Sequence, residues 1–176
     1  MKILKLITLL LSLSFVVTGQ DNDGNRGYIV ETGDMAPSFT ADLINGETFD
    51  LEEQRGNVVM LQFTASWCGV CREEMPHIEE EIWQKHKDDG LVVVGIDRDE
   101  PLETVKKFAN ETGVTYPLAL DPDAEIFSLY AEKKAGITRN VLINRKGEIV
   151  FLTRLFNPEE FSGLVEKIDE LMKKEQ

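Results

Sequence analysis

The chain has 176 residues, of which 42% are hydrophobic, 19 are Lys or Arg and 32 are Asp or Glu. This length and apolar content are typical of one globular domain with its own core, and the formal charge of −13 argues against a basic surface for nucleic acid or anionic lipid. The chain has only two cysteines, which excludes a four-cysteine zinc site and a scaffold held by several disulfides. Both cysteines are therefore free for another role.

Residues 1–19 have the pattern of a secretory signal peptide. Lys2 and Lys5 precede an apolar run over 6–17 that is too short to cross a bilayer, and Gly19 offers a small residue at the cleavage point. The alternative is a buried N-terminal helix. We predict cleavage after Gly19, export to the periplasm or the exterior, and no membrane anchor on the mature chain.

The remainder of the chain reads as a short polar tether followed by one domain. Residues 20–32 are polar and glycine-rich, with one apolar cluster at 28–30 that could add an edge strand. The sequence then predicts, in chain order, a β-hairpin over 39–43 and 48–51, a buried strand over 57–63, a helix from 71 to about 87, a buried strand over 91–96, helices over 101–112 and 123–135, strands over 140–143 and 148–155, and a helix that starts near 158.

This order of elements defines the fold class. Strands that alternate with helices and end in a hairpin predict one α/β domain over 33–174, with a mixed central sheet flanked by helices. In the N-terminal hairpin, Asn45-Gly46 predicts a type I′ turn because both residues tolerate positive φ.

The two cysteines lie between the strand over 57–63 and the helix that follows it. At this position the backbone N–H groups and the positive end of the helix favour a thiolate on Cys68. Cys68 is therefore the predicted nucleophile, and Cys71, one turn further in, is predicted to resolve the mixed disulfide. Half a zinc site and an inert structural disulfide are the alternatives, but no second cysteine pair exists and so short a loop constrains the unfolded chain little.

Three stretches of the sequence carry a resemblance to a known family. They are Gly33 to Phe39 (GDMAPSF), Val58 to Pro76 (VVMLQFTASWCGVCREEMP) and Gly136 to Gly147. Together they resemble the thioredoxin superfamily, and more closely its exported TlpA/ResA-like branch. The resemblance implies a thioredoxin-like fold with an N-terminal β-hairpin and a central strand-and-helix insertion around 97–122.

The same resemblance implies an activity. Relatives of this kind exchange disulfides with exported protein substrates, often in the reducing direction, so the chain is predicted to be a protein-disulfide oxidoreductase. We expect protein thiol or disulfide substrates, an upstream redox donor, no cofactor and a monomer.

Residues around the cysteine pair are assigned by their positions. Glu74 matches an acid that the family places near the cysteines, where it could relay protons or tune the thiol pKa values; the alternative is a solvated helix carboxylate. Trp67 is predicted to form a wall of the substrate groove, unless it is only a structural aromatic, and Gly69 and Val70 are predicted to join it at the substrate-binding surface. Gln62 occupies the place of a buried acid in thioredoxins proper.

Thr138 departs from the family pattern. The family normally has a cis-proline at this place, opposite the cysteines, and a non-proline cis bond costs ~3 kcal/mol, so we expect a trans Ile137–Thr138 bond. Since the backbone at Thr138 normally pairs with substrate, we predict retained redox activity with an altered choice of partner. Arg139 beside it is read either as an ordinary exposed base or as a positive charge that favours thiolates at the site.

One alternative function remains open. A non-catalytic protein could use Cys68 and Cys71 to bind a metal or an iron–sulfur cluster between two chains, helped by the missing proline. His77 and His86 are nine residues apart on one predicted helix and project to opposite sides, so they cannot share a metal ion. The sequence therefore predicts no metal site of its own, and thiol–disulfide exchange as the function.

Overall fold

The computed structural model describes residues 26–173. The predicted signal peptide and residues 20–25 of the predicted tether lie outside this range. Within it, no helix combines the length and the apolar character that crossing a bilayer requires.

A five-stranded mixed sheet forms the centre of the domain, in the order β5-β4-β3-β6-β7. β3, β4 and β5 are parallel to one another, whereas β6 and β7 run antiparallel to their neighbours. Every residue of β3 is buried, because the sheet is covered on both faces, as its near-continuous apolar run indicates. The strands are β3 (Val58–Thr64), β4 (Leu91–Arg98), β5 (Leu118–Asp121), β6 (Arg139–Ile143) and β7 (Ile149–Arg154).

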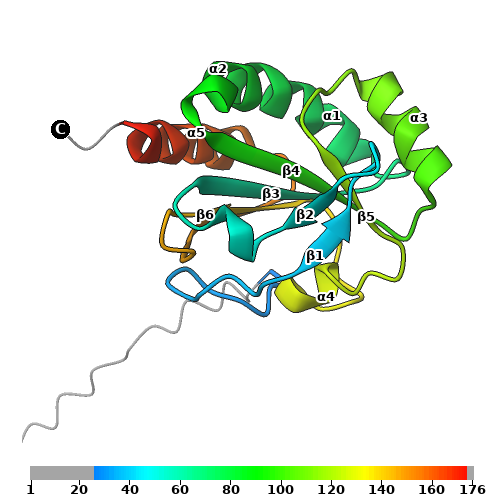
Figure 1. The fold of residues 1–176 in the computed structure, drawn as a ribbon, viewed down its shortest axis with the longest axis horizontal. Helices are drawn as coiled ribbons and strands as arrows, with labels where there is room; N and C mark the ends of the chain where they lie inside the picture. Colours follow the sequence, from blue (N-terminus) through cyan, green and yellow to red (C-terminus); the bar gives the residue numbers. More distant parts are fainter. Residues whose placement is uncertain (1–25, 174–176) are drawn as a thin grey trace, which may run out of the picture.

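Helices cover one face of this sheet, and the hairpin and a short helix cover the other (Figure 1). Alternate residues of each strand point to opposite faces, so Met60 packs with the helices and Leu61 with the hairpin side. The helix face carries α1 (Gly69–His77), its continuation through η2 (Ile78–Trp83), α2 (Gln84–His86) and η3 (Lys87–Asp89), then α3 (Leu102–Thr112) and α5 (Pro158–Met172). The other face carries β1 (Thr40–Asp42), β2 (Thr48–Asp50) and α4 (Phe127–Tyr130), with η1 (Glu52–Gln54) following β2.

The N-terminal hairpin forms as predicted, but its turn is of another type. Only Gly46 has positive φ, at 90°, so the predicted type I′ turn is wrong. The Gly46 N–H donates to the Leu43 carbonyl, and the Leu43 N–H donates to the Glu47 carbonyl, which makes a three-residue loop. The side chain of Asn45 accepts the Glu47 N–H at 3.0 Å, so Asn45 stabilises the turn through its amide instead of a left-handed backbone.

The helix predicted over 123–135 is wrong in length, because α4 has only four residues. The Asp121 carboxylate accepts the Ile126 and Phe127 N–H groups at 3.0 and 2.8 Å and so fixes the start of the helical turn. After Tyr130 the chain turns extended at Ala131, which forms a β-bridge with Tyr28. The apolar cluster at 28–30 thus contributes a single bridge and no edge strand.

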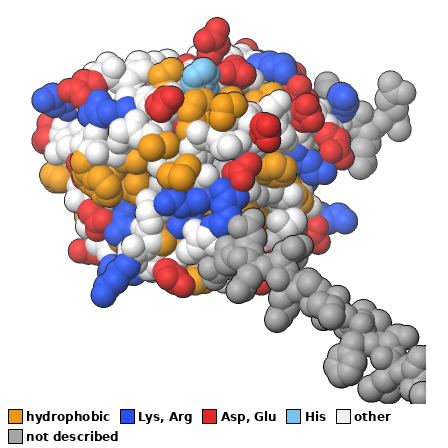
Figure 2. Space-filling model, turned by 180° about the vertical axis from the view of Figure 1, so that it is seen from behind, with side chains coloured by type: hydrophobic (Ala, Val, Ile, Leu, Met, Phe, Trp, Pro, Cys, Tyr) orange, Lys and Arg blue, Asp and Glu red, His pale blue; other side chains and the backbone are white. Residues whose placement is uncertain are grey.

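The surface carries charge of both signs. On the face shown in Figure 2, apolar side chains gather in patches between groups of acidic and basic side chains. The excess of acidic residues therefore does not make this face uniformly negative.

Candidate active site

Cys68 and Cys71 form a disulfide where β3 leads into α1. Cys68 is the N-cap of α1, and its sulfur accepts the Cys71 N–H at 3.2 Å. The two positions differ in access: Cys68 is 8% exposed, whereas Cys71 is fully buried. The four-residue turn brings their Cα atoms to 5.3 Å, which suits a disulfide without rearrangement of the helix start.

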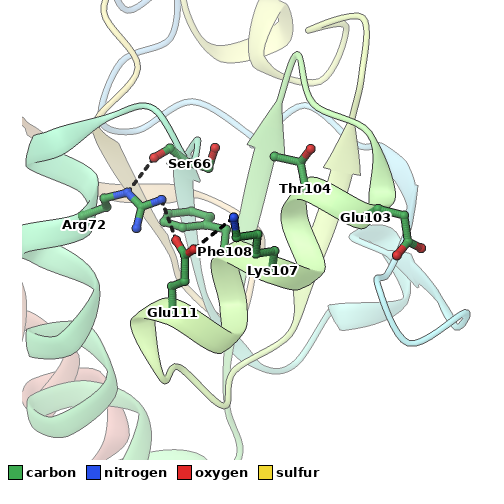
Figure 3. Close-up of a pocket in the computed structure, with 7 residues that line it drawn as sticks. All are labelled: Ser66, Arg72, Glu103, Thr104, Lys107, Phe108 and Glu111. Atoms are coloured by element: carbon green, nitrogen blue, oxygen red, sulfur yellow. Dashed lines mark hydrogen bonds and ion pairs between the residues drawn. The ribbon is translucent and has the colours of Figure 1, made fainter.

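The loop before the cysteines is held by charged side chains from two neighbouring segments. The Glu100 carboxylate accepts the Ser66 N–H and hydroxyl, each at 2.6 Å. The Arg72 Nε donates to the Ser66 carbonyl at 2.6 Å, and its Nη2 pairs with Glu111 of α3 at 3.0 Å (Figure 3). The guanidinium also lies 4.8 Å above the Phe108 ring. These contacts fix the backbone just before Cys68.

A polar cavity of about 360 Å³ lies beside this loop. Figure 3 shows its lining, with Arg72 reaching from α1 toward α3 above the Phe108 ring. Lys107 and Glu103 add one charge of each sign from α3. The cavity therefore offers charges of both signs next to the cysteine loop.

Thr138 lies directly against the disulfide. Its hydroxyl oxygen is 3.2 Å from the Cys68 sulfur and 3.3 Å from the Cys71 sulfur, and the residue is 2% exposed. The described chain has no cis peptide bond, so the expectation of a trans Ile137–Thr138 bond is confirmed. The threonine thus places a hydroxyl, and not a proline ring, over the two sulfurs.

Glu74 is buried beneath the site, so its reading as a solvated helix carboxylate is wrong. It accepts the Asn140 amide at 2.7 Å and the Gln62 amide at 3.2 Å, while Gln62 in turn accepts the Tyr116 hydroxyl at 2.7 Å. Burial raises the pKa of Glu74 to about 7, although the two amide hydrogen bonds act in the opposite direction. This carboxyl can therefore gain or lose a proton near neutral pH.

Three residues assigned to the substrate-binding surface lie next to the disulfide along the chain. Trp67 is 62% exposed, Gly69 is exposed and Val70 is half-buried. A large exposed aromatic beside a nearly buried sulfur gives the site an apolar rim.

Arg139 does not belong to that rim, and its reading as an ordinary exposed base is wrong. The residue is fully buried, and its guanidinium lies 4.5 Å above the Tyr28 ring on the α4 side of the sheet. Its Nε donates to the Gly136 carbonyl at 3.0 Å, whereas Nη1 and Nη2 have no hydrogen-bond partner within residues 26–173. Burial lowers the pKa of Arg139. Thr138 faces the sulfurs and Arg139 faces the α4 side, because neighbouring residues of an extended chain point to opposite sides.

Sequence reasoning missed a second buried carboxyl, Asp97. It lies in β4 opposite Thr64 of β3, is fully buried, and its two oxygens have no hydrogen-bond partner among the described residues. Burial, and then the nearby charge of Glu100, raise the pKa of Asp97 to about 8. The available signal was an acidic residue directly after the apolar run over 91–96, in the strand next to the one that leads to the cysteine pair.

The histidines make separate contacts. His77 lies 2.8 Å from Glu81 on the surface of the helix, and His86 lies 2.8 Å from Asp169 of α5. Within residues 26–173, no three His, Cys, Asp or Glu side chains are grouped so as to hold a metal ion.

The fold and this dithiol site define a thiol–disulfide oxidoreductase of the thioredoxin-like class. The Redoxin family model matches residues 31–168, and the chain belongs to this family. Among curated relatives, the thiol-disulfide oxidoreductase ResA of Halalkalibacterium halodurans is 29% identical over 147 residues, which cover 84% of this chain and 80% of the relative. ResA of Bacillus thuringiensis is 31% identical over 121 residues, covering 69% and 68%.

Solved structures agree with this classification. A candidate protein disulfide isomerase from Bacteroides thetaiotaomicron is 63% identical with a TM-score of 0.82, and the match covers 84% of this chain and 94% of that one. A candidate thiol:disulfide interchange protein DsbE from Chlorobium tepidum is 29% identical with a TM-score of 0.73, covering 81% and 99%. The protein therefore carries out thiol–disulfide exchange with protein substrates through Cys68 and Cys71.

Proposed function

We propose that this oxidoreductase is an exported protein reductant in which Cys68 attacks the substrate disulfide and Cys71 releases the product. The observation that carries the proposal is the asymmetry of the pair: Cys68 caps the helix and is 8% exposed, whereas Cys71 is fully buried. A helix N-terminus stabilises a thiolate, and only the accessible sulfur can meet a protein disulfide.

The reaction then proceeds in two exchange steps. The Cys68 thiolate attacks one sulfur of the substrate disulfide, a mixed disulfide forms, and the other substrate sulfur leaves as a thiolate. Cys71 loses its proton and attacks the Cys68 sulfur, which restores the Cys68–Cys71 disulfide and releases the second substrate thiolate. Two electrons pass to the substrate, and an upstream dithiol donor must return them.

Glu74 is the proposed acceptor of the Cys71 proton. The two residues are three positions apart on α1 and therefore share a helix face. A pKa of about 7 suits this role, because a base works best when its pKa lies near the operating pH. Its Asn140 and Gln62 partners orient the carboxyl without neutralising it.

The reducing direction is supported by two acidic side chains near the pair, against the single positive charge of Arg72 beside the cysteine loop. Glu74 lies beneath the site and Glu100 holds the loop before it. Nearby negative charge disfavours a thiolate, and a less stable reduced form means a lower reduction potential. Trp67, Gly69 and Val70 form the proposed substrate-binding surface, and Thr138 borders it through its contact with both sulfurs. Arg139 is left out, because its guanidinium packs on the Tyr28 ring.

The proposed export rests on residues 1–19 as a cleaved signal peptide, with residues 20–32 as a tether and 33–174 as the redox domain. Expression of the full chain with fractionation of the cells tests this point. We expect a mature monomer that begins near residue 20 in the periplasmic or secreted fraction, and a cytoplasmic full-length product contradicts it.

Insulin reduction and a glutathione titration test the redox function. The reduced protein, freed of reductant, is expected to reduce insulin and to have a potential below about −220 mV. Cys68→Ser is expected to abolish turnover, whereas Cys71→Ser is expected to accumulate a mixed disulfide through Cys68. A potential above about −180 mV overturns the reducing direction. Metal bound with two cysteines per chain, without any turnover, favours the alternative binding function.

A further inference from the structure

We propose that Thr138 is a catalytic residue whose hydroxyl donates a hydrogen bond to the Cys68 thiolate in the reduced enzyme, and then to the Cys71 thiolate in the mixed disulfide. The proposal rests on the assignment of Cys68 as the attacking and Cys71 as the resolving cysteine. It gives a chemical role to a position that was assigned only to substrate binding.

The position of the hydroxyl supports the first part of the proposal, the hydrogen bond to Cys68. The Thr138 oxygen lies 3.2 Å from one sulfur and 3.3 Å from the other. Both sulfurs are in a disulfide and carry no proton, so the threonine is the donor in these contacts. Because the residue is 2% exposed, water does not compete for this proton.

Reduction strengthens the contact. A thiolate carries a full negative charge, and hydrogen bonds to charged acceptors are about twice as strong as neutral ones. When Cys68 is a thiolate, the hydroxyl therefore lowers the pKa of Cys68, in addition to the Cys71 N–H that its sulfur already accepts.

The near-equal distances from the hydroxyl to the two sulfurs support the second part, the hydrogen bond to Cys71 in the mixed disulfide. A hydroxyl has one proton and serves one sulfur at a time. In the mixed disulfide the Cys68 sulfur is neutral again, so the hydroxyl can turn to Cys71 as this residue loses its proton to Glu74. The same group thus stabilises each attacking thiolate in turn, and no atom is transferred to or from Thr138.

The backbone of Thr138 is held in place from behind. Its carbonyl accepts the Leu155 N–H at 3.1 Å and the Arg154 Nη1 at 3.2 Å. The side chain therefore starts from a fixed backbone position, and a contact to either sulfur requires only a small adjustment of the hydroxyl.

Thr138→Val tests the proposal, with Thr138→Ser as the matched control that keeps a hydroxyl. The first measurement is the pH dependence of Cys68 alkylation by iodoacetamide in the reduced protein. We expect the Cys68 midpoint to rise by about one pH unit in Thr138→Val, a tenfold change equal to about 1.4 kcal/mol, and to stay within about 0.3 unit in Thr138→Ser. The charged side chains near the loop and Thr138 are the same in all three proteins: Arg72, Glu74, Asp97, Glu100 and Arg154.

The second measurement follows the two steps separately. Reduction of 5,5′-dithiobis(2-nitrobenzoate) releases one thiolate when Cys68 attacks and another when Cys71 closes the ring. At pH 6 we expect both phases to slow about threefold in Thr138→Val, since a tenfold loss of thiolate is partly offset by the higher nucleophilicity of a more basic sulfur. Circular dichroism checks that the variant is folded.

An unchanged Cys68 midpoint, or an unchanged rate in either phase, overturns the proposal. A Thr138→Ser protein that behaves like Thr138→Val also overturns it, because packing and not the hydroxyl would then matter. These readouts use a small disulfide and require no protein substrate, so they remain informative if the measured potential contradicts the reducing direction.

Discussion

Glu74 of α1 and Asp97 of β4 are two buried carboxyl groups close to the strand that leads to the cysteines, and they differ in their hydrogen-bond donors. Glu74 accepts hydrogen bonds from two amides, whereas Asp97 has no such donor within residues 26–173. Burial raises both pKa values, to about 7 for Glu74 and about 8 for Asp97, where Glu100 adds to the rise. The amide donors keep Glu74 ionisable at neutral pH, and without such donors Asp97 is mostly protonated there.

Glu74→Ala is the strongest test of this comparison. We expect the free energy of unfolding to fall by about 3 kcal/mol, because the Gln62 and Asn140 amides lose a buried acceptor and a cavity opens. Urea titration at pH 7, followed by circular dichroism, measures the change. Glu73→Ala at the exposed neighbouring position is the control and is expected to stay within about 0.5 kcal/mol. Equal losses in the two variants contradict the role of the hydrogen bonds.

Asp97→Asn tests the carboxyl that lacks donors. The folded pKa of about 8 lies above the ordinary value of 3.8. Between about pH 4 and 8, the folded protein therefore keeps a proton that the unfolded chain has already released. The stability of the wild type therefore falls as pH rises through this range. We expect the variant to be close to the wild type at pH 4 and about 2 kcal/mol more stable by pH 6, with the difference still growing up to about pH 8.

The pH series of urea titrations measures this difference. Asp123→Asn, at an exposed position, is the control and is expected to change little with pH. An Asp97→Asn protein that parallels the wild type over the whole series contradicts a raised pKa for Asp97.

Glu74→Gln keeps one of the two acceptor contacts to Asn140 and Gln62 and removes the base. The wild-type rate of ring closure by Cys71 is expected to rise with pH through about 7, as Glu74 ionises. In the variant this rise is lost, and at pH 8 closure is about tenfold slower, equal to about 1.4 kcal/mol in activation free energy. The second thiolate release described above measures it, with Glu73→Gln as the control. An identical pH profile in Glu74→Gln argues against proton transfer to Glu74.

Tyr116→Phe has the smallest expected effect. It removes the hydroxyl that donates to Gln62 at 2.7 Å and lowers the free energy of unfolding by about 1 kcal/mol. Combined with Glu74→Ala, the losses should fall short of additivity by about 0.5 kcal/mol, because both changes act on Gln62. Strict additivity in the double variant means that the three side chains do not form one network.

Local sequence features were sufficient for the cysteine pair but not for its surroundings. Cys68 and Cys71 follow a buried strand and begin a helix, and both properties are encoded within about fifteen residues of the chain. The contact of Thr138 with both sulfurs depends on the antiparallel register of β6 against β3, which joins residues about seventy positions apart. No short-range pattern contains that distance.

The buried charges were missed for a similar reason. Asp97 looks like a polar residue at the end of a strand, and its burial depends on the following segment, where Glu100 folds back to Ser66. Arg139 looks like a surface base, yet α4 and Tyr28 enclose it after the chain leaves its expected helix at Ala131. Tertiary packing overrode local preference in both places.

The end of the edge strand β7 holds the backbone of Thr138 in place beside the two sulfurs. Arg154 at the end of β7 and Leu155 just beyond it both donate hydrogen bonds to the Thr138 carbonyl. Gly136 has no side chain that would displace the Arg154 guanidinium. β7 lies at the edge of the sheet, with β6 between it and the strand that leads to the cysteines. An edge strand thus fixes the backbone from which the Thr138 hydroxyl reaches the sulfurs. A substitution at Arg154, remote from both sulfurs in the chain, would therefore change how they react.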